Sequence, residues 1–204
     1  MKIATFNVRT DTPVDGENRW QFRKGLILDK LTAEQPDVIG FQETTPVMAN
    51  FIKKYMPDYW FVGCGRNADY LGENNMIGFK PDKYELIELE TFWLSETPDV
   101  PGSRYANQSV CPRVCTHAVL RPLDGGTMFH AYNTHLDHIS DEARRLGARA
   151  ILDHMARDLK RRPLPLTLTG DMNAYPDSAP IQEFLNDKTV HLTNQTPNFP
   201  ASYH

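Results

Sequence analysis

The sequence predicts a single α/β (α+β) domain in which two mainly antiparallel sheets pack together and helices cover the outside. Near the N-terminus, a helical pattern lies between two strand-like runs at residues 3–9 and 37–43. Further strand-like runs then follow one another, separated by turn signals: residues 76–80, 84–94, 113–121 and 127–135. Because these central strands succeed each other as hairpins, the pattern does not fit a purely alternating βαβ fold.

Length and composition are those of one ordinary domain. The chain has 204 residues, which suits a single domain over residues 1–204, and 40% of them are hydrophobic, enough for a sizeable core. With 22 basic and 26 acidic residues the net charge is −4, so the broad basic field of a general nucleic-acid binder is missing. A divalent metal would add local positive charge, so a nucleic-acid substrate is disfavoured but stays open.

The cysteines and the N-terminus indicate a cytoplasmic setting. The three cysteines are odd in number, lack CxxC spacing and are typical of reduced thiols: Cys64, Cys111 and Cys115. No apolar leader precedes the first strand, and no apolar run approaches the roughly 20 residues that span a bilayer. We therefore expect a cytoplasmic protein without a membrane span, although a secreted chain whose leader had been removed would look the same. The oligomeric state is not indicated.

Polar side chains end both N-terminal strands. Asn7 and Arg9 fall at the C-terminal end of the first strand, where a plain turn is the alternative for Asn7. The helix between the strands shows apolar residues at helical spacing and is ended by Pro36. Glu43 directly follows the apolar run of the second strand, which is awkward for a core and natural for a site at a sheet edge. An ordinary solvent-facing strand end is the alternative there.

The middle of the chain supplies a helix, a short strand and two loops. The helix opens at Pro46, since proline is favoured in the first turn, and residues 59–64 form a short aromatic strand. The polar loop at residues 65–75 carries Glu73. The loop at residues 96–108 is long enough to be functional.

The stretch from residue 133 to residue 173 organises the predicted site. Asn133 and His135 share one face of an alternating strand, and the apolar run at residues 164–169 ends at Gly-Asp. A helix at residues 141–160 joins the two. Imidazole, carboxylate and amide groups at adjacent strand ends have the chemistry of a hard divalent cation and a phosphate ester. A short helix around residues 181–185 follows, and residues 194–204 show no strong element.

Five motifs carry a family resemblance: TFN at residues 5–7, QE at 42–43, FWLSETP at 92–98, NTHLDH at 133–138 and GDMN at 170–173. Because all five occur in one order at family-like intervals, the chain resembles the endonuclease/exonuclease/phosphatase superfamily, in particular its small bacterial metal-dependent hydrolase branch. The resemblance covers nearly the whole chain. It implies a four-layer α/β sandwich of two sheets flanked by helices, a divalent cation (usually Mg²⁺, with Mn²⁺ as the alternative) and hydrolysis of phosphate esters.

The resemblance implies a metal site made of three residues. Glu43 matches the metal-binding glutamate of the family, and a carboxylate is the hard oxygen ligand that Mg²⁺ prefers. Asn7 matches the asparagine beside the metal. Asp171 matches the carboxylate that orients and activates the attacking water, with the metal nearby.

The resemblance also implies the catalytic residues. Asn173 matches the amide that donates to the phosphate as charge builds on its oxygens. His135 matches the histidine that contacts the scissile phosphate. Glu73 stands where some relatives place a glutamate that pairs with that histidine, and such a carboxylate partner would favour a charged imidazole.

Three residues are assigned to substrate binding: Arg9, Arg113 and Asn133. Arg113 begins a strand in a segment that resembles the PRxxT stretch of the family, which favours a structural or phosphate-facing role over that of a surface arginine. Asp137 and His138 are expected to brace the site without touching the substrate.

One departure from the family pattern affects the expected activity. An Ile-Asp-Tyr-Ile-like strand and a following Ser-Asp-His motif do not occur before the last residue, His204, so we expect a C-terminally truncated sandwich that lacks its last strands. In relatives that aspartate completes metal ligation and that histidine transfers a proton. Since losing an acid–base group costs about 10²–10⁴ in rate, we expect weak or absent activity from this chain and activity from a longer form.

The function predicted from the sequence is therefore a Mg²⁺-dependent hydrolase, a phosphodiesterase or phosphatase that uses metal-assisted attack of water. A small phosphorylated molecule is mildly favoured as the substrate by the acidic charge and the short loops. Two alternatives stay open, a nuclease and a catalytically inactive family member that serves as a binding module.

Overall fold

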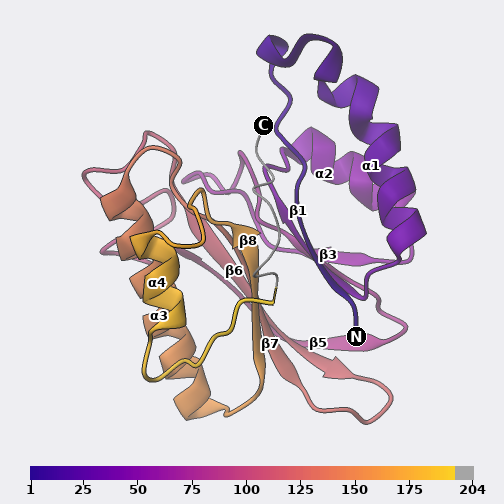
Figure 1. The fold of residues 1–204 in the computed structure, drawn as a ribbon. Coiled ribbons are helices and arrows are strands. Elements are labelled where there is room, and N and C mark those ends of the chain that lie inside the picture. The colour runs from indigo at the N-terminus through magenta and orange to yellow at the C-terminus, as the bar shows by residue number, and fades with distance from the viewer. Residues whose placement is uncertain (196–204) are drawn as a thin grey trace.

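The computed structural model describes residues 1–195. Two four-stranded sheets pack together, and helices cover the outer side of each sheet, which gives four layers (Figure 1). The predicted fold class, an α/β sandwich of two sheets flanked by helices, is confirmed. Of the segment expected to lack a strong element, residues 196–204 lie outside the described residues.

Each sheet combines one parallel pair of strands with antiparallel pairs. The first sheet has the order β1-β2-β4-β3, with β1 (Ile3–Asn7), β2 (Val38–Gln42), β4 (Ile77–Phe79) and β3 (Trp60–Val62). The second has the order β5-β6-β7-β8, with β5 (Tyr84–Trp93), β6 (Val114–Pro122), β7 (Phe129–His135) and β8 (Leu166–Asp171). The pairs β1–β2 and β7–β8 are parallel and the other pairs are antiparallel, so the sheets are mainly antiparallel as predicted.

Four α-helices among the described residues form the outer layers. The first sheet is covered by α1 (Trp20–Glu34) and α2 (Pro46–Tyr55), and the second by α3 (Asp141–Arg161) and α4 (Ala179–Leu185) (Figure 1). A 3₁₀ helix, η1 (Pro13–Asn18), precedes α1. Among residues 1–195, no helix is both long enough and apolar enough to cross a bilayer.

Apolar side chains fill the three spaces between the layers. The first space lies between α1, α2 and the first sheet, the second between the two sheets, and the third between the second sheet and α3. Representative pairs in these spaces are Phe41 with Ile52, Phe79 with Leu120, and Phe92 with Met155. Burial of this kind is the main stabilising contribution to such a sandwich.

Asn133 on β7 joins the two sheets. The side chain is fully buried, its Nδ2 donates to the carbonyls of Phe41 (2.8 Å) and Met76 (3.1 Å), and its Oδ1 accepts from Gln42 Nε2 at 2.7 Å. A Cβ atom on Gly40 would lie 2.5 Å from Asn133 Oδ1, so glycine is required for β2 to approach β7 here.

The first two strands end earlier than the sequence predicts. β1 stops at Asn7 instead of residue 9, and β2 stops at Gln42 instead of residue 43. The cause is the left-handed backbone of Arg9 (φ 53°) and Glu43 (φ 62°), which cannot continue a strand. Non-glycine residues held in this conformation concentrate at functional sites.

Candidate active site

Two carboxylates, one from each sheet, meet at one rim of the sandwich. Glu43 follows β2 of the first sheet, and Asp171 ends β8 of the second. Asn7, at the end of β1, lies between them, because its Nδ2 donates to Glu43 Oε1 and to Asp171 Oδ2, both at 2.8 Å. The structure thus brings together the three residues that the sequence assigned to a metal.

The strand topology explains this convergence. β1 and β2 are parallel, with Asn7 opposite Gln42, so their carboxyl ends meet at one edge of the first sheet. β7 and β8 are also parallel, and His135 lies opposite Asp171. The backbone N–H of Gly170 donates to Thr5 Oγ1 at 3.0 Å, which connects β8 to β1 across the two sheets.

The donor atoms at this rim fit a divalent cation. Glu43, His135 and Asp171 each offer a ligand atom, and these atoms lie within 4.8 Å of one another. The two carboxylates are the oxygen ligands that a hard ion such as Mg²⁺ or Mn²⁺ prefers. Glu43 is held in place from both sides, since its Oε2 also accepts from the backbone N–H of Thr10 at 2.7 Å.

His135 and Asn173 form a second pair beside Asp171. His135 Nε2 lies 2.9 Å from Asn173 Nδ2 and 3.9 Å from Asp171 Oδ2. Asn173 is itself fixed by two contacts, because its backbone N–H donates to Asp171 Oδ1 (2.9 Å) and its Nδ2 donates to the Leu136 carbonyl (3.0 Å). With φ 47°, Asn173 is a further left-handed residue at this rim.

The electrostatic surroundings of His135 favour the neutral imidazole. Burial lowers the pKa of His135 to about 4, and the positive charges of Arg113 and Arg66 lower it as well. Asp171 and Glu43 act in the opposite direction and are outweighed. The sequence predicted a charged imidazole from a pairing with Glu73, and the structure gives that carboxylate a different partner.

Glu73 is held by Arg66. Arg66 Nη1 donates to Glu73 Oε2 at 2.6 Å, and both side chains are largely buried. Burial raises the pKa of Glu73, while the charge of Arg66 opposes this shift. Arg66 was not singled out from the sequence, because a loop arginine carries no motif and its partner depends on the conformation of the loop.

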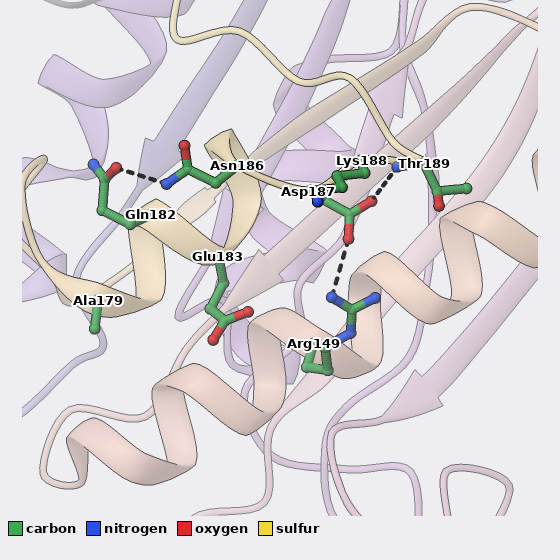
Figure 2. Close-up of a pocket in the computed structure, with 8 residues that line it drawn as sticks. All are labelled: Arg149, Ala179, Gln182, Glu183, Asn186, Asp187, Lys188 and Thr189. Carbon is green, nitrogen blue, oxygen red and sulfur yellow. Dashed lines mark hydrogen bonds and ion pairs between the residues drawn. The ribbon is translucent and has the colours of Figure 1, made fainter.

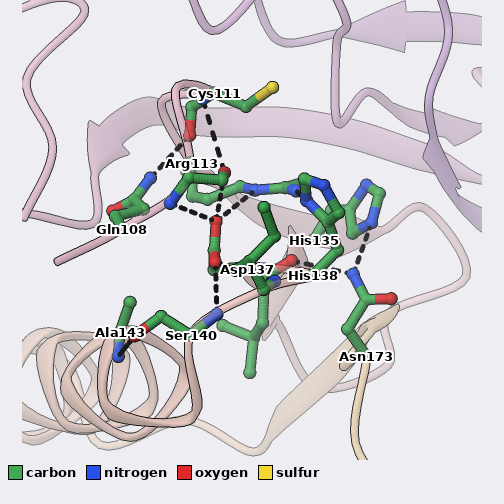
Figure 3. A network of polar contacts seen from close by, with 12 residues as sticks. Gln108, Cys111, Arg113, His135, Asp137, His138, Ser140, Ala143 and Asn173 are labelled. Atoms are coloured by element: carbon green, nitrogen blue, oxygen red, sulfur yellow. Dashed lines mark hydrogen bonds and ion pairs between the residues drawn. The ribbon is translucent and has the colours of Figure 1, made fainter.

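Arg113 is almost completely buried and only partly satisfied. The side chain is 4% exposed; its Nη2 lies 2.8 Å from His138 Nδ1 and its Nε lies 3.7 Å from Asp137 Oδ2 (Figure 3). Its Nε and Nη1 have no hydrogen-bond partner among residues 1–195. Burial is the main cause that lowers the pKa of Arg113, and the charge of Arg66 acts in the same direction. An incompletely paired buried guanidinium next to His135 is suited to an anion.

Asp137 braces the segment that carries His135. Its carboxylate accepts from the backbone N–H groups of Ser109 (3.2 Å), Ile139 (3.0 Å) and Ser140 (2.8 Å), and also from the Ser109 hydroxyl (Figure 3). Burial alone would raise the pKa of Asp137, but these hydrogen bonds and Arg113 lower it overall. This contact pattern agrees with the expected supporting role of Asp137.

Two residues assigned to substrate binding lie apart from the buried centre of the site. Arg9 is exposed, and its Nε and Nη2 donate to Asp15 at 3.1 and 2.9 Å. Asn133 lies between the sheets, where the protein itself uses both its oxygen and its amide nitrogen. The structure therefore gives Asn133 a role in joining the sheets, because a fully buried amide with these partners has no group to offer a substrate.

A groove elsewhere on the surface lacks comparable chemistry. It measures about 540 Å³ and lies between α3 and α4, lined in part by Arg149, Gln182, Asn186 and Asp187 (Figure 2). Arg149 Nη1 donates to Asp187 Oδ2 at 3.0 Å, and Asn186 Nδ2 donates to Gln182 Oε1 at 3.0 Å (Figure 2). Since these polar groups pair with one another, the rim at Glu43 and Asp171 stays the candidate site.

The fold of this sandwich is that of a known class of proteins. The sequence matches the endonuclease/exonuclease/phosphatase family over residues 4–204, and the chain belongs to that family. The suspected resemblance is confirmed.

Individual relatives agree with the family match. A Bacteroides vulgatus protein of the same family is 33% identical and has a TM-score of 0.86, with 93% of this chain and 72% of that chain covered. A mannosyl-6-phosphatase from Bacteroides thetaiotaomicron is 30% identical and also has a TM-score of 0.86, with 91% and 70% covered. An uncharacterised protein of Acanthamoeba polyphaga mimivirus is 26% identical over 151 residues, and the match spans only 54% of its length.

Proposed function

We propose that this chain is a divalent-metal-dependent phosphoesterase that hydrolyses a phosphomonoester of a small molecule by attack of water. The observation that carries the proposal is the meeting of Glu43 and Asp171 across the two sheets, bridged by Asn7 at 2.8 Å on each side. Paired carboxylates at one rim suit a hard cation, and the neighbouring Arg113 suits the phosphate that such a cation would help to bind.

Glu43 and Asp171 would hold the cation, with Mg²⁺ favoured and Mn²⁺ as the alternative. When bound, the cation supplies positive charge to the phosphoryl oxygens and acidity to a coordinated water. Asp171 is the base that orients this water, since its Oδ1 is fixed by the Asn173 backbone at 2.9 Å. Orientation of this kind lowers the barrier because the attacking oxygen is positioned before reaction.

Asn173, His135 and Arg113 would act on the phosphoryl group. The N–H groups of Arg113 that lack a partner among residues 1–195 donate to oxygens on which charge builds during attack. The Asn173 amide joins them by exchanging its contact with His135 Nε2 for a phosphoryl oxygen. His135 lies 2.9 Å from the Asn173 amide, so the two side chains can contact the same phosphate. Its lowered pKa leaves the imidazole neutral at pH 7, which makes it a hydrogen-bonding group for the phosphate at that pH.

A phosphomonoester is preferred to a nucleic acid for two reasons. The net charge of −4 gives no long-range attraction for a polyanion, whose binding depends on many cationic contacts. The Bacteroides thetaiotaomicron relative with 30% identity is a mannosyl-6-phosphatase, which supports a sugar phosphate as the substrate.

Phosphate release from a substrate panel tests the proposal. The panel contains hexose 6-phosphates, nucleoside monophosphates, a bis(nitrophenyl) diester and a short DNA duplex, each assayed with Mg²⁺, with Mn²⁺ and with a chelator. We expect weak, metal-dependent release from the hexose phosphates, which Glu43→Gln abolishes. Asp29→Asn in α1 is the matched control, because that carboxylate is exposed on the outer helix layer.

Three outcomes would count against the proposal. Turnover that persists in chelator would show that the reaction needs no divalent cation. Cleavage of the duplex alone would favour a nuclease. Absent turnover in this chain and in a longer form, with phosphate still bound, would favour a binding module.

A further inference from the structure

A second cluster, of two imidazoles and one carboxylate, lies between the second sheet and α3, outside the candidate active site. His117 on β6 and His130 on β7 face Asp158, near the C-terminal end of α3. All three residues are buried, with exposures of 0%, 0% and 2%, and each offers a ligand atom within 4.8 Å of the others.

Hydrogen bonds fix where the protons of the two imidazoles lie. His130 Nε2 is 3.0 Å from the Arg162 carbonyl, which can only accept, so this nitrogen carries a proton. Neutral His130 must then accept at Nδ1, and His117 Nε2, 2.9 Å away, donates to it. It follows that neutral His117 has a lone pair at Nδ1.

That lone pair faces a carboxylate. His117 Nδ1 is buried without a hydrogen-bond partner among the described residues and lies 3.5 Å from Asp158 Oδ2. Tyr132 does not relieve the contact, because its hydroxyl donates to the same Oδ2 at 2.6 Å. Two acceptors held against each other in a dry interior are unfavourable unless a positive charge lies between them.

The separation of the two acceptors suits a tetrahedral metal ion. Two ligands about 2.1 Å from a tetrahedral zinc are roughly 3.4 Å apart. The observed 3.5 Å between His117 Nδ1 and Asp158 Oδ2 is close to this value.

An opening reaches the cluster from outside. A groove of about 370 Å³ is lined by Glu88, Glu90, Arg157, Arg161 and Asp158 itself. The nearby charges are mixed: Arg161 Nη2 lies 3.5 Å from Asp158 Oδ1, and Glu90 pairs with His154 at 3.0 Å. Among residues 1–195, the arginine contact of Asp158 is to Oδ1, and the oxygen that faces His117 is Oδ2.

We infer that His117 and Asp158 bind a transition-metal ion of the zinc class, at a site separate from the carboxylate rim. His117 Nδ1 and the Asp158 carboxylate are the protein ligands. His130 orients the His117 ring through its other nitrogen, as partners behind metal-binding histidines do. Water from the groove completes the coordination. One imidazole and one carboxylate select zinc over magnesium, which favours oxygen ligands alone.

Metal binding by the full chain tests the inference without an activity assay. After treatment with chelator, the protein is titrated with Co²⁺, which absorbs visible light when bound tetrahedrally, and with Zn²⁺ in competition. The measurement is made on the Glu43→Gln/Asp171→Asn double variant, which removes both carboxylates of the rim. We expect one equivalent of Co²⁺ with visible absorption, displaced by Zn²⁺ and not by Mg²⁺.

Two variants locate the ion. Asp158→Asn keeps the size of the side chain and removes its charge, and it should weaken Co²⁺ binding by at least about a hundredfold, since loss of even a residue behind a metal ligand costs about 10–100-fold. His154→Gln is the control, since His154 is a buried histidine of the same helix that stacks on Phe92, and it should bind Co²⁺ unchanged. No bound Co²⁺ in the Glu43→Gln/Asp171→Asn variant, or equal binding after Asp158→Asn is added to it, would overturn the inference.

Discussion

Two clusters of histidine and aspartate occupy the same β-sandwich and differ in their position along the strands. The front cluster, Glu43, His135 and Asp171, lies at strand ends, and the Asp171 side chain is 32% exposed. The rear cluster, His117, His130 and Asp158, lies between the second sheet and α3 and is buried throughout. Similar side chains are therefore accessible to a phosphate ester in one place and shielded from it in the other.

The charges around the leading histidine also differ between the clusters. Burial lowers the pKa of both His135 and His117. In both clusters a carboxylate opposes the shift, Asp171 at the front and Asp158 at the rear, but only the front histidine also has the charge of an arginine, Arg113, acting on it. The front site therefore offers a guanidinium to an anion beside its carboxylates, and the rear cluster offers only a carboxylate and imidazoles.

The largest expected difference in turnover is between two variants, each of which replaces the aspartate of one cluster with asparagine. Asp171→Asn should lower kcat/KM by about 10²–10⁴, since it removes the base that orients water. Asp158→Asn should leave turnover unchanged, because Asp158 lies between the second sheet and α3, apart from the rim. Steady-state kinetics and urea unfolding of both variants measure this contrast. Equal losses of turnover would contradict the separation of the two clusters.

Arg113 tests whether the front cluster receives an anion. Arg113→Lys keeps the charge but loses the planar donor fork, and a charged hydrogen bond is worth about 1.5–3 kcal/mol, so kcat/KM should fall roughly 10- to 100-fold. Inhibition by inorganic phosphate should weaken in parallel. Arg121→Lys, at an exposed arginine paired with Glu85, is the matched control. Unchanged phosphate inhibition in Arg113→Lys would contradict the assignment.

The pH dependence of stability probes the rear cluster. Because the folded-state pKa of His117 is lowered from 6.5 to about 4, the unfolded chain binds an additional proton between these values. Stability should therefore fall as the pH decreases through this window in the presence of chelator. Urea unfolding at several pH values should show that the free energy of unfolding depends less steeply on pH in His117→Phe than in the wild type. Parallel slopes would indicate that His117 titrates normally in the folded protein.

The smallest effect is expected outside both clusters. Arg149→Ala breaks the pairs with Asp153 and Asp187 on the groove in Figure 2, at a side chain that is 45% exposed. Exposed ion pairs contribute at most about 1 kcal/mol each, so loss of both should change the free energy of unfolding by no more than about 2 kcal/mol, and turnover should stay the same. A loss of turnover here would show that the groove takes part in function.

The sequence predicted the front cluster and did not predict the rear one. The front residues follow apolar strands and lie in family motifs: Asn7, Glu43 and Asp171. Their places at strand ends and the family resemblance together predicted that they meet at one rim. His117 and His130 lie inside strands, and their meeting with Asp158 depends on the strand register and on how α3 packs. Sequence periodicity indicates which face a residue takes, but it does not indicate which residue lies opposite.

The layers, the hairpins and the order of the helices could be predicted because they depend on local patterns. The ends of β1 and β2 could not, since they depend on left-handed backbone conformations at Arg9 and Glu43. The partner of Glu73 also could not, because Arg66 reaches it through the fold of the loop. In both cases the prediction was wrong because the conformation of the residue is set by its surroundings in the fold.

The Asn7 bridge has a consequence for how the enzyme would lose function. One carboxylate belongs to each sheet, so neither half of the sandwich holds a complete site, and sliding of one half past the other would separate Glu43 from Asp171. A small shear, well short of denaturation, would be enough to disable the chemistry. Heating should therefore abolish turnover at a lower temperature than it abolishes helical circular dichroism.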